Sequence, residues 1–349
     1  MTNLKKSAAF AGSAVLLLAT ACGSGESAEQ GSGGEPDTVT VQLDYQLRGN
    51  HGMFYVAREM GYFEEENINV EEITTGSGSP DALRIVGKGQ ADFGFADLPS
   101  LVTARSQNVP VQTLAAVNQV SPLGMCSLAD NLELDSVEDL RGSKVGVHPG
   151  GSTFIFYKAL LQANGIERDE MEEVTVTPPY ENYLVEGQVD SVVCYIDAEV
   201  PILEDAAGGE GALSILQGSD AGYEAYGSGL VTSDEMVEDN SDLVQRFTNA
   251  YLRAFDYVNE NPGETAQLLA ETSPEQADNA GLFEEQLQAD IDHTFTSDAT
   301  EELGLGAMTE DKWNATIDIL ADQGVLEGTP PAAEDVYAPE FTESYYAEN

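Results

Sequence analysis

Three polar side chains with different hydrogen-bonding chemistry lie between the first predicted β-strand and the start of the helix that follows it. Asp44 follows the strand directly, and Asn50 and His51 open the helix after it. A carboxylate accepts hydrogen bonds, an amide donates and accepts them, and histidine titrates near neutral pH. All three are therefore candidates for ligand contact. Asn50 also suits a plain helix N-cap, and a lone histidine such as His51 is more often a structural partner.

Two glycine-rich turns, each leading into a helical pattern, are a second candidate for ligand contact. The first turn, Thr75–Ser79, contains Ser77 and Gly78, and the second turn, Pro149–Thr153, contains Gly150, Gly151, Ser152 and Thr153. Backbone N–H groups at the start of a helix, together with the helix dipole, receive an anionic or carbonyl group. Either turn is also consistent with a simple helix cap.

The segments that position these residues alternate between strand and helix patterns. Strand patterns cover residues 39–43, 68–73, 91–96, 111–117, 144–147, 174–176 and 189–195. Helical patterns cover residues 51–60, 80–88, 98–106, 136–140, 152–164, 181–186, 241–259, 263–271, 283–294 and 309–323. This alternation predicts an α/β fold with a largely parallel sheet and helices on both faces.

The strand–helix rhythm starts a second time after Asp130 and gives way to helices after about Leu230. We therefore expect two lobes, with the helical tail packed on the first. Residues 38–122 and 228–349 would form lobe 1, and residues 123–227 would form lobe 2. The chain would cross near Val120–Ser127 and Tyr223–Val231. A fold of this kind binds its ligand in the crevice between the lobes.

The N-terminus has the layout of a secretory signal peptide, which we place at residues 1–21. Lys5 and Lys6 precede an apolar run, and small residues lead up to Cys22. The run is far shorter than the ~20 residues that cross a bilayer. Because Ala19-Thr20-Ala21-Cys22 resembles a bacterial lipobox, we expect lipidation at Cys22. The alternative is an ordinary secretory signal with an incidental cysteine.

Residues 22–37 predict a flexible linker between this anchor and the folded body. The segment is rich in Gly, Ser and Glu and lacks large apolar residues, a composition that behaves as a flexible tether. We expect an extracytoplasmic protein, held by its lipid anchor at the cell surface or in the periplasm.

The charge of the chain excludes two classes of partner. The 349 residues contain 62 acidic and 14 basic side chains, for a formal charge of −48. Such a charge repels nucleic acid and anionic lipid surfaces, so the lipid anchor is the expected membrane contact. The acids are spread along the chain, which indicates a solvated acidic coat rather than an attractant for a cationic ligand. At 42% hydrophobic residues, the chain has enough material for a core.

Cysteine and histidine spacing indicates neither a metal site nor a catalytic centre. Once Cys22 is assigned to the anchor, Cys126 and Cys194 remain, and they suit either a disulfide or two buried thiols. The three histidines are far apart, and there is no Cys-x-x-Cys, P-loop or Gly-x-Ser-x-Gly motif. We therefore expect no metal, no cofactor and no catalytic residues.

A series of motifs, in order across nearly all of the mature chain, resembles one family of ABC-transporter solute-binding proteins. The motifs are Asp44–His51, Met53–Ala57, Gly61–Phe63, Gly87–Gly94, Asp139–Val147, Gly187–Asp190 with Glu199, and Trp313 with Tyr337–Phe341. That family comprises binders of thiamine-pyrimidine precursors and their nitrate, sulfonate and taurine relatives. The resemblance implies a type II periplasmic-binding-protein fold that closes around a ligand by hinge motion.

The same resemblance assigns roles to several residues. Tyr45 stands where the family places an aromatic side chain that stacks on a flat ring, although a core tyrosine is the alternative. Asp97 and Glu199 would accept hydrogen bonds from an amino-pyrimidine; otherwise they are a helix cap and a surface acid. Tyr180 and Tyr195 are candidate aromatic walls of the cleft. The implied partners are a small-molecule ligand, an ABC permease and its ATPase, with the binding protein itself a monomer.

Two departures from the family pattern bear on the ligand and the activity. Arg48 is a positive charge that the pyrimidine binders do not usually carry here; it suits either an anionic ligand or a neighbouring acid. Pyrimidine, flavin-like ring, sulfonate and nitrate therefore all remain as ligands.

A eukaryotic branch of the family synthesises the pyrimidine with a lysine, a histidine and an iron-binding cysteine motif. The matching positions here are Ala96 and Ser100, so we expect a binding protein rather than an enzyme. An adhesion or structural lipoprotein is disfavoured because the chain has no repeats.

Overall fold

The computed structural model describes residues 34–322, 324–326 and 328–348. The expected signal peptide at residues 1–21, the lipidation site Cys22 and most of the 22–37 linker lie outside the described residues. The folded unit described below begins at Pro36. Across the described ranges, no helix combines the length and the apolar character needed to traverse a bilayer.

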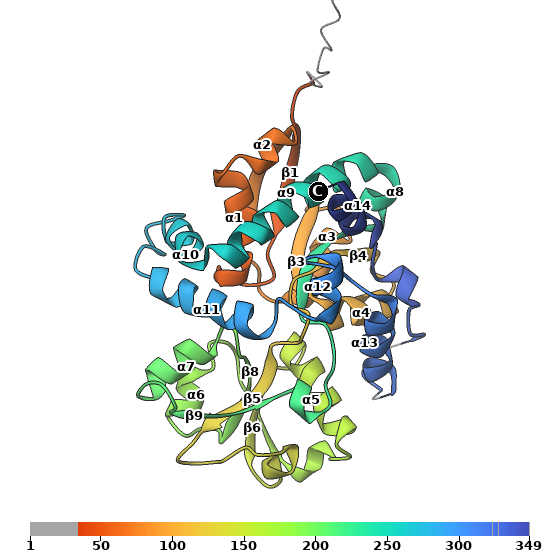
Figure 1. Cartoon of the computed structure of the whole chain (residues 1–349). Helices are drawn as coiled ribbons and strands as arrows, with labels where there is room; N and C mark the ends of the chain where they lie inside the picture. Colours follow the sequence, from red (N-terminus) through yellow and green to blue (C-terminus); the bar gives the residue numbers. More distant parts are fainter. Residues whose placement is uncertain (1–33, 323, 327, 349) are drawn as a thin grey trace, which may run out of the picture. The chain divides into compact units, whose positions relative to one another are not determined.

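Two five-stranded sheets organise the folded unit, one in each lobe (Figure 1). The sheet of lobe 1 has the order β2-β1-β3-β10-β4, with β1 Asp37–Gln42, β2 Ile68–Thr74, β3 Phe93–Asp97, β4 Val111–Ala116 and β10 Ser228–Ser233. The sheet of lobe 2 has the order β7-β6-β8-β5-β9, with β5 Leu123–Leu128, β6 Lys144–Val147, β7 Glu172–Thr175, β8 Ser191–Tyr195 and β9 Leu213–Gln217.

Both sheets are mixed, but four of the five strands in each run in the same direction, so the expected largely parallel arrangement holds with one reversed strand per sheet. In lobe 1, β10 runs antiparallel to β3 and β4, and in lobe 2, β5 runs antiparallel to β8 and β9. The physical reason is the route of the chain. β5 and β10 enter their sheets directly after the chain has passed from the other lobe, through residues 117–122 and 218–227. Parallel pairing requires a crossover connection such as a helix, and these two entries contain none that returns along the same sheet.

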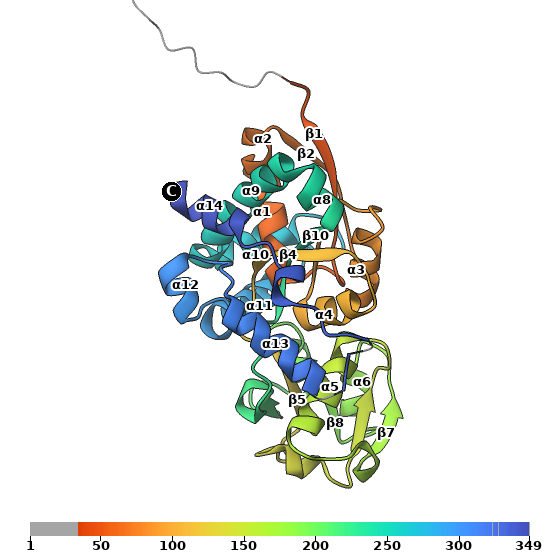
Figure 2. The same cartoon turned by 90° about the vertical axis from the view of Figure 1, so that its right-hand side faces the viewer.

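Helices from both ends of the chain cover the sheet of lobe 1 (Figure 2). The N-terminal group is η1 Gly49–His51, α1 Gly52–Glu59, α2 Tyr62–Glu65, α3 Ser79–Val86 and α4 Leu98–Ser106. The C-terminal group is α8 Asp234–Asp239, α9 Ser241–Glu260, α10 Pro262–Ala270, α11 Ala280–His293, α12 Asp298–Leu303, α13 Glu310–Asp322, η5 Ala333–Asp335 and α14 Glu340–Glu348. α9 packs on α1, α14 on β4 and α13 on α4, so C-terminal helices contact the N-terminal elements of lobe 1.

Lobe 2 has shorter helices around its sheet, and one of them starts at the expected glycine-rich turn. They are η2 Val137–Leu140, α5 Ser152–Ala163, η3 Arg168–Glu170, α6 Glu181–Val185, α7 Val200–Ala207 and η4 Ser219–Ala221. α7 contacts α11 of lobe 1, and Figure 1 shows α11 at the level where the two lobes meet.

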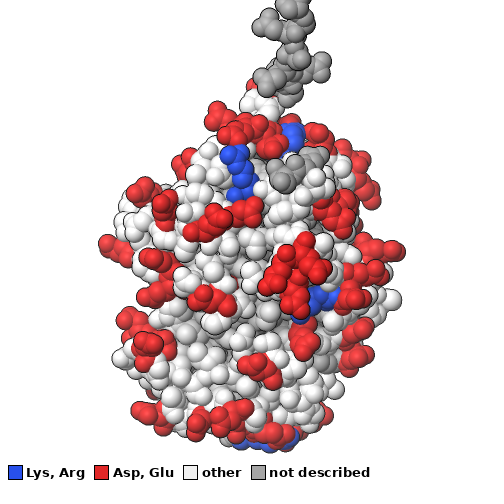
Figure 3. All heavy atoms as spheres, in the orientation of Figure 1, with Lys and Arg blue, Asp and Glu red and all other residues white. Residues whose placement is uncertain are grey.

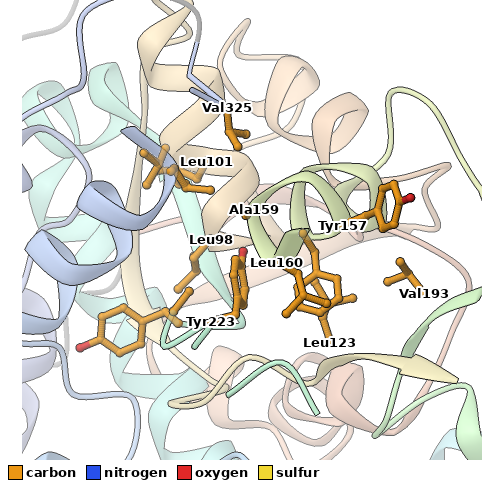
Figure 4. Close-up of a cluster of buried hydrophobic side chains, with 14 of the residues drawn as sticks. Leu98, Leu101, Leu123, Tyr157, Ala159, Leu160, Val193, Tyr223 and Val325 are labelled. Carbon is orange, nitrogen blue, oxygen red and sulfur yellow. The ribbon is translucent and has the colours of Figure 1, made fainter. Parts of the chain in front are cut away.

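Among the described residues, the hydrophobic core forms three clusters: one within lobe 1, one within lobe 2 and one that joins the lobes. Within lobe 1, Phe93 of β3 stacks on Phe247 of α9 with ring centroids 3.6 Å apart. A second cluster brings Leu101 of α4 together with Leu160 of α5 and Tyr223 of the returning segment (Figure 4). This apolar cluster ties the lobes together on the side where the chain crosses between them.

The two remaining cysteines form a disulfide, which decides between the two alternatives left open by the sequence. Cys126 lies on β5 and Cys194 on the neighbouring antiparallel strand β8, with their Cα atoms 5.9 Å apart. Both side chains are fully buried. The bond therefore fastens two adjacent strands in the core of lobe 2.

Acidic side chains are scattered over the visible face of both lobes, and few basic ones lie among them (Figure 3). No single acidic patch dominates this face. The distribution agrees with a solvated coat, because an attractant for a cation would concentrate its charge around one site.

Candidate functional site

A small cavity of about 60 Å³ lies between the lobes, at the carboxyl end of β1 and the start of α5. We call it the inner cavity. Lobe 1 contributes Asp44, Tyr45, Arg48, Ser77, Gly78 and Ser79, and lobe 2 contributes His148, Gly151, Ser152, Thr153, Pro178, Tyr180, Tyr195 and Glu199. Most of the residues that the sequence nominated are thus brought together here from two lobes.

Asp44 is the centre of a buried hydrogen-bond network in the lobe 1 wall. Its Oδ2 accepts from Arg48 Nη2 at 2.7 Å and from Ser79 Oγ at 3.4 Å, and its Oδ1 bonds to His51 Nε2 at 3.0 Å. The Nδ1 atom of His51 accepts the backbone N–H of Arg48 at 3.3 Å, so in the neutral ring Nε2 carries the proton. The Asp44–Arg48 pair confirms that Arg48 meets a neighbouring acid.

The ionisation of this network follows from its burial and its charges. Burial favours a neutral Asp44, but the charge of Arg48 and the hydrogen bond from His51 outweigh it and lower the pKa of Asp44. Burial lowers the pKa of His51 as well, against the pull of Asp44. The site therefore holds an Asp44 carboxylate, an Arg48 cation and a neutral His51.

Arg48 reaches from lobe 1 toward lobe 2. Its Nε donates to Asn50 Oδ1 at 3.0 Å, and its guanidinium carbon lies 5.3 Å from the ring centroid of Tyr195 in lobe 2, within the range of a cation–π contact. The sequence left the role of Arg48 open, and the structure makes it a wall of the inner cavity.

The lobe 2 wall is built around Tyr195 at the end of β8. Its hydroxyl is 2.6 Å from Ser152 Oγ, and its backbone N–H donates to Glu199 Oε2 at 2.9 Å. Burial raises the pKa of Tyr195 well above its usual range, so the phenol stays neutral. Gly150, in the turn before α5, has φ of +90°, a conformation that favours glycine. This turn places the first residues of α5 against the cavity.

Four residues that the sequence nominated do not line the inner cavity: Asn50, His51, Asp97 and Gly150. Asn50 and His51 instead hydrogen-bond to residues that line the cavity: Asn50 accepts from Arg48, and His51 bonds to Asp44. Asp97 caps α4, because its Oδ2 accepts from the backbone N–H of Ser100 at 2.8 Å and from the hydroxyl of the same residue at 2.5 Å. Burial raises the pKa of Asp97 to about 6.

A larger cavity of about 310 Å³ adjoins the inner cavity and shares Tyr45, Arg48, Pro178, Tyr180 and Glu199 with it. We call it the outer cavity. Its further walls come from the loops after β1 and β7, from α7 and the segment before it, and from α11 and the segment before it. These residues are Gln46, Leu47, Pro179, Ala198, Ile202, Leu203, Gln276, Asn279, Leu282, Phe283 and Gln286. No local motif marks the α7 and α11 residues, because their place depends on how the C-terminal helices pack.

Gln286 of α11 links the two lobes beside the outer cavity. Its Oε1 accepts from the backbone N–H of Gly49 in lobe 1 at 2.9 Å, and its Nε2 donates to the backbone carbonyl of Ala198 in lobe 2 at 2.8 Å. A buried amide that satisfies both backbone groups stabilises the contact between the lobes. Sequence reasoning missed Gln286 for the same reason as the other α11 residues.

Comparison with known proteins places this arrangement in a family. The family model described as "NMT1/THI5 like" matches residues 48–265. A formylaminopyrimidine-binding protein from Halalkalibacterium halodurans is 28% identical, covering 86% of this chain and 90% of the relative. The riboflavin-binding protein RibY from Chloroflexus aurantiacus is 26% identical, covering 87% and 85%.

Two further comparisons concern activity and fold. A 4-amino-5-hydroxymethyl-2-methylpyrimidine phosphate synthase from Legionella pneumophila is 26% identical, covering 68% of this chain and 74% of the relative. The structure of a putative periplasmic sulfonate-binding protein, SsuA from Methylobacillus flagellatus, superposes with a TM-score of 0.65 at 17% identity, covering 90% and 95%. The fold is therefore the periplasmic-binding-protein fold.

Proposed function

Because the chain belongs to the NMT1/THI5-like family, we propose that it is the extracytoplasmic solute-binding component of an ABC importer. It captures a small heteroaromatic ligand, resembling a thiamine-pyrimidine precursor, between its lobes and delivers it to a permease. The observation that carries the proposal is the wall of the inner cavity, where Tyr45, Tyr180 and Tyr195 stand beside the acceptors Asp44 and Glu199.

Each part of that wall has a use in binding an amino-substituted ring. An aromatic side chain stacks on a flat heterocycle with a gain of about 0.5–1.5 kcal/mol beyond area burial. The carboxylates of Asp44 and Glu199 accept hydrogen bonds from ring amino groups. Residues from both lobes contribute, so a bound ring would hold the lobes together and shift the population toward the closed form.

The charges of the site favour this ligand over a sulfonate or nitrate. Within the described part of the chain, Arg48 is the one Lys or Arg residue that lines either cavity, and it is bonded to Asp44 at 2.7 Å. An oxyanion would compete with Asp44 for Arg48 and would also face Glu199. A neutral or cationic ring that donates hydrogen bonds meets no such competition.

A flavin-like ring is the second candidate, and the outer cavity is the reason. The cavity has a volume of about 310 Å³, and Leu47, Ile202 and Phe283 give it an apolar wall. A pyrimidine leaves most of that space to water, whereas a larger fused ring would fill it. The relative from Chloroflexus aurantiacus that is named for riboflavin binding supports this candidate.

We propose the oligomeric state, the membrane anchor, the lobe boundaries and the docking partner from the sequence. The protein is a monomer, is anchored through a lipid on Cys22, and binds without catalysis. Lobe 1 comprises residues 38–122 and 228–349, and lobe 2 comprises residues 123–227. The importer role extends to docking on an ABC permease with its ATPase.

A binding screen tests the ligand assignment. Thermal shift and calorimetry with formylaminopyrimidine, riboflavin, taurine, an alkanesulfonate and nitrate should give a hit among the ring compounds. Tyr45→Ala should abolish that hit, whereas Tyr257→Ala, on α9 and away from both cavities, should leave it unchanged. Binding of nitrate or sulfonate alone would replace the proposed ligand, and unchanged affinity in Tyr45→Ala would remove Tyr45 from the site.

The anchor and the absence of catalysis have separate tests. Cys22→Ser should release the protein into the medium or the soluble periplasmic fraction, and continued retention in the membrane would refute acylation at Cys22. Incubation with pyridoxal phosphate and iron should yield no pyrimidine product. Formation of that product would place the chain with the synthases.

A further inference from the structure

Two buried aspartates from opposite lobes meet in the contact between the lobes. Asp197 follows β8 in lobe 2, and Asp290 lies on α11 of lobe 1. Their exposed fractions are 2% and 1%. Gln286, one turn before Asp290 on α11, donates to the carbonyl of Ala198, next to Asp197, at 2.8 Å, and the buried Oδ1 of Asp197 has no hydrogen-bond donor among the described residues. Because an ionised carboxylate only accepts hydrogen bonds, the two carboxyl groups can bond to each other only while one of them carries a proton.

Neutral polar groups hold each carboxyl group in place. Asn118 Nδ2 and Thr294 Oγ1 both donate to Asp290 Oδ1, at 2.6 and 2.7 Å. Asn50 Nδ2 donates to Asp197 Oδ2 at 3.1 Å. Asn118 belongs to the segment in which the chain passes from lobe 1 to lobe 2. Asp290 is thus fixed to lobe 1 at the crossing, while Asp197 belongs to lobe 2.

The charges that face the pair favour one shared proton over two ionised carboxylates. Among the described residues, Arg48 is the cation that acts on both groups, and it is already bonded to Asp44. His51, on the same turn as Arg48, adds no positive charge because burial lowers its pKa. Burial and the neighbouring Asp197 raise the pKa of Asp290 well above its usual range.

We propose that Asp197 and Asp290 form a proton-binding site that couples closure of the two lobes to the uptake of one proton. When the lobes separate, both carboxyl groups enter water and are ionised at neutral pH. Closure returns them to a buried contact that holds together only with a proton between them, and that proton comes from solvent. Acid therefore favours the closed form, and a rise in pH favours opening.

Linkage sets the size of the effect. Uptake of one proton changes the ratio of closed to open molecules by up to tenfold for each pH unit. The ratio of closed to open molecules depends on pH between the ordinary aspartate pKa of about 3.9 and the raised pKa of the closed pair. Above that raised pKa, the ratio no longer changes with pH. A ligand bound by the closed form alone is then held more tightly in acid.

The distance between the lobes, measured without ligand, tests this coupling independently of the identity of the ligand. Nitroxide labels at Gln267→Cys on α10 and Asp205→Cys on α7, both exposed positions, report the separation by double electron–electron resonance. Cys22→Ser keeps label off the N-terminus. In the otherwise unaltered chain, the population at short distance should grow as the pH falls from 9 to 5.

Substitutions at the pair separate the proton site from other acidic groups. Asp290→Asn supplies an N–H donor to Asp197 without a titrating proton, so the short distance should dominate at every pH; Asp197→Asn should act in the same way. Asp256→Asn is the matched control, because Asp256 of α9 also has a pKa raised by burial but contacts Tyr345 within lobe 1. It should keep the original pH dependence.

Two results would overturn the proposal. One is a distance distribution in the unaltered pair that is the same at pH 5 and pH 9. The other is a pH dependence that survives in both Asp290→Asn and Asp197→Asn, since the proton would then bind elsewhere. Loss of the dependence in Asp256→Asn would count against the pair in the same way.

Discussion

Replacing Asp97 with asparagine should change how the stability of the protein depends on pH. Asp97 is 1% exposed, and burial raises its pKa from 3.8 to about 6. Between about pH 4 and pH 6, Asp97 is therefore protonated in the folded state and ionised in the unfolded chain. Because the folded state binds more protons in this window, the stability contributed by Asp97 is present below about pH 4 and is lost as the pH rises through 6.

The magnitude follows from the difference in pKa between the two states. A difference of about two pKa units corresponds to about 3 kcal/mol. Asp97→Asn keeps an oxygen that accepts from Ser100 but has no titrating proton, so its penalty is independent of pH. The free energy of unfolding of Asp97→Asn, taken relative to the unaltered protein, should therefore rise by about 3 kcal/mol from pH 4 to pH 7.

Urea unfolding followed by circular dichroism at four pH values measures this difference directly. Titration of the other carboxylates cancels in the comparison, because they are the same in both proteins. Asp130→Asn, at an exposed position in the turn after β5, is the control and should show no change with pH. A relative stability of Asp97→Asn that stays constant within about 0.5 kcal/mol would refute the assignment of a buried, proton-holding Asp97.

Three further predictions concern the contacts that hold the lobes and the site. Arg48→Met should lower the free energy of unfolding by about 3–5 kcal/mol at pH 8, because it leaves a buried Asp44 charge unpaired, and adding Asp44→Asn should restore most of the loss. Urea unfolding of the single and double variants checks this. Joint replacement of Cys126 and Cys194 by serine removes a crosslink across 68 residues and should lower the free energy of unfolding by about 4 kcal/mol through chain entropy, measured by urea unfolding of this variant against the unaltered, oxidised protein. Gln286→Leu should weaken closure by about 1–3 kcal/mol, visible as a longer interlobe distance with the pH dependence intact; an unchanged distance would contradict its bridging role.

Local patterns predicted the elements that position the site. The strands at β1, β2, β3, β4 and β6 and the long helices α5, α9 and α13 lie within a few residues of the expected ranges, since alternation and helical spacing are properties of neighbouring residues. The strands β5, β9 and β10 were missed. β5 and β10 fall where the sequence indicated only crossings, because a strand that enters a sheet from another lobe has no distinctive local pattern.

The candidate site was predicted in part for the same reason. Strand ends and glycine-rich turns nominated Asp44, Tyr45 and Ser152, all of which line the inner cavity. Asp97 was nominated as a ligand acceptor, with a helix cap as the alternative, and the structure shows the cap. The walls on α7 and α11 were not predicted, because no local signal records which helix of the tail faces lobe 2.

The amino-acid sequence by itself determined the acidic surface, the order of strands and helices, the glycine turns and the resemblance to a family of binding proteins. These depend on composition and on residues close together in the chain. Only the tertiary structure decided that Arg48 pairs with Asp44, that Cys126 bonds to Cys194, and that Asp197 meets Asp290. The Cys126–Cys194 and Asp197–Asp290 contacts join segments far apart in the sequence, and they exist because the chain crosses twice between two sheets and returns its last helices to the first. Asp44 and Arg48 are only four residues apart, but the fold buries both side chains and so pairs their charges.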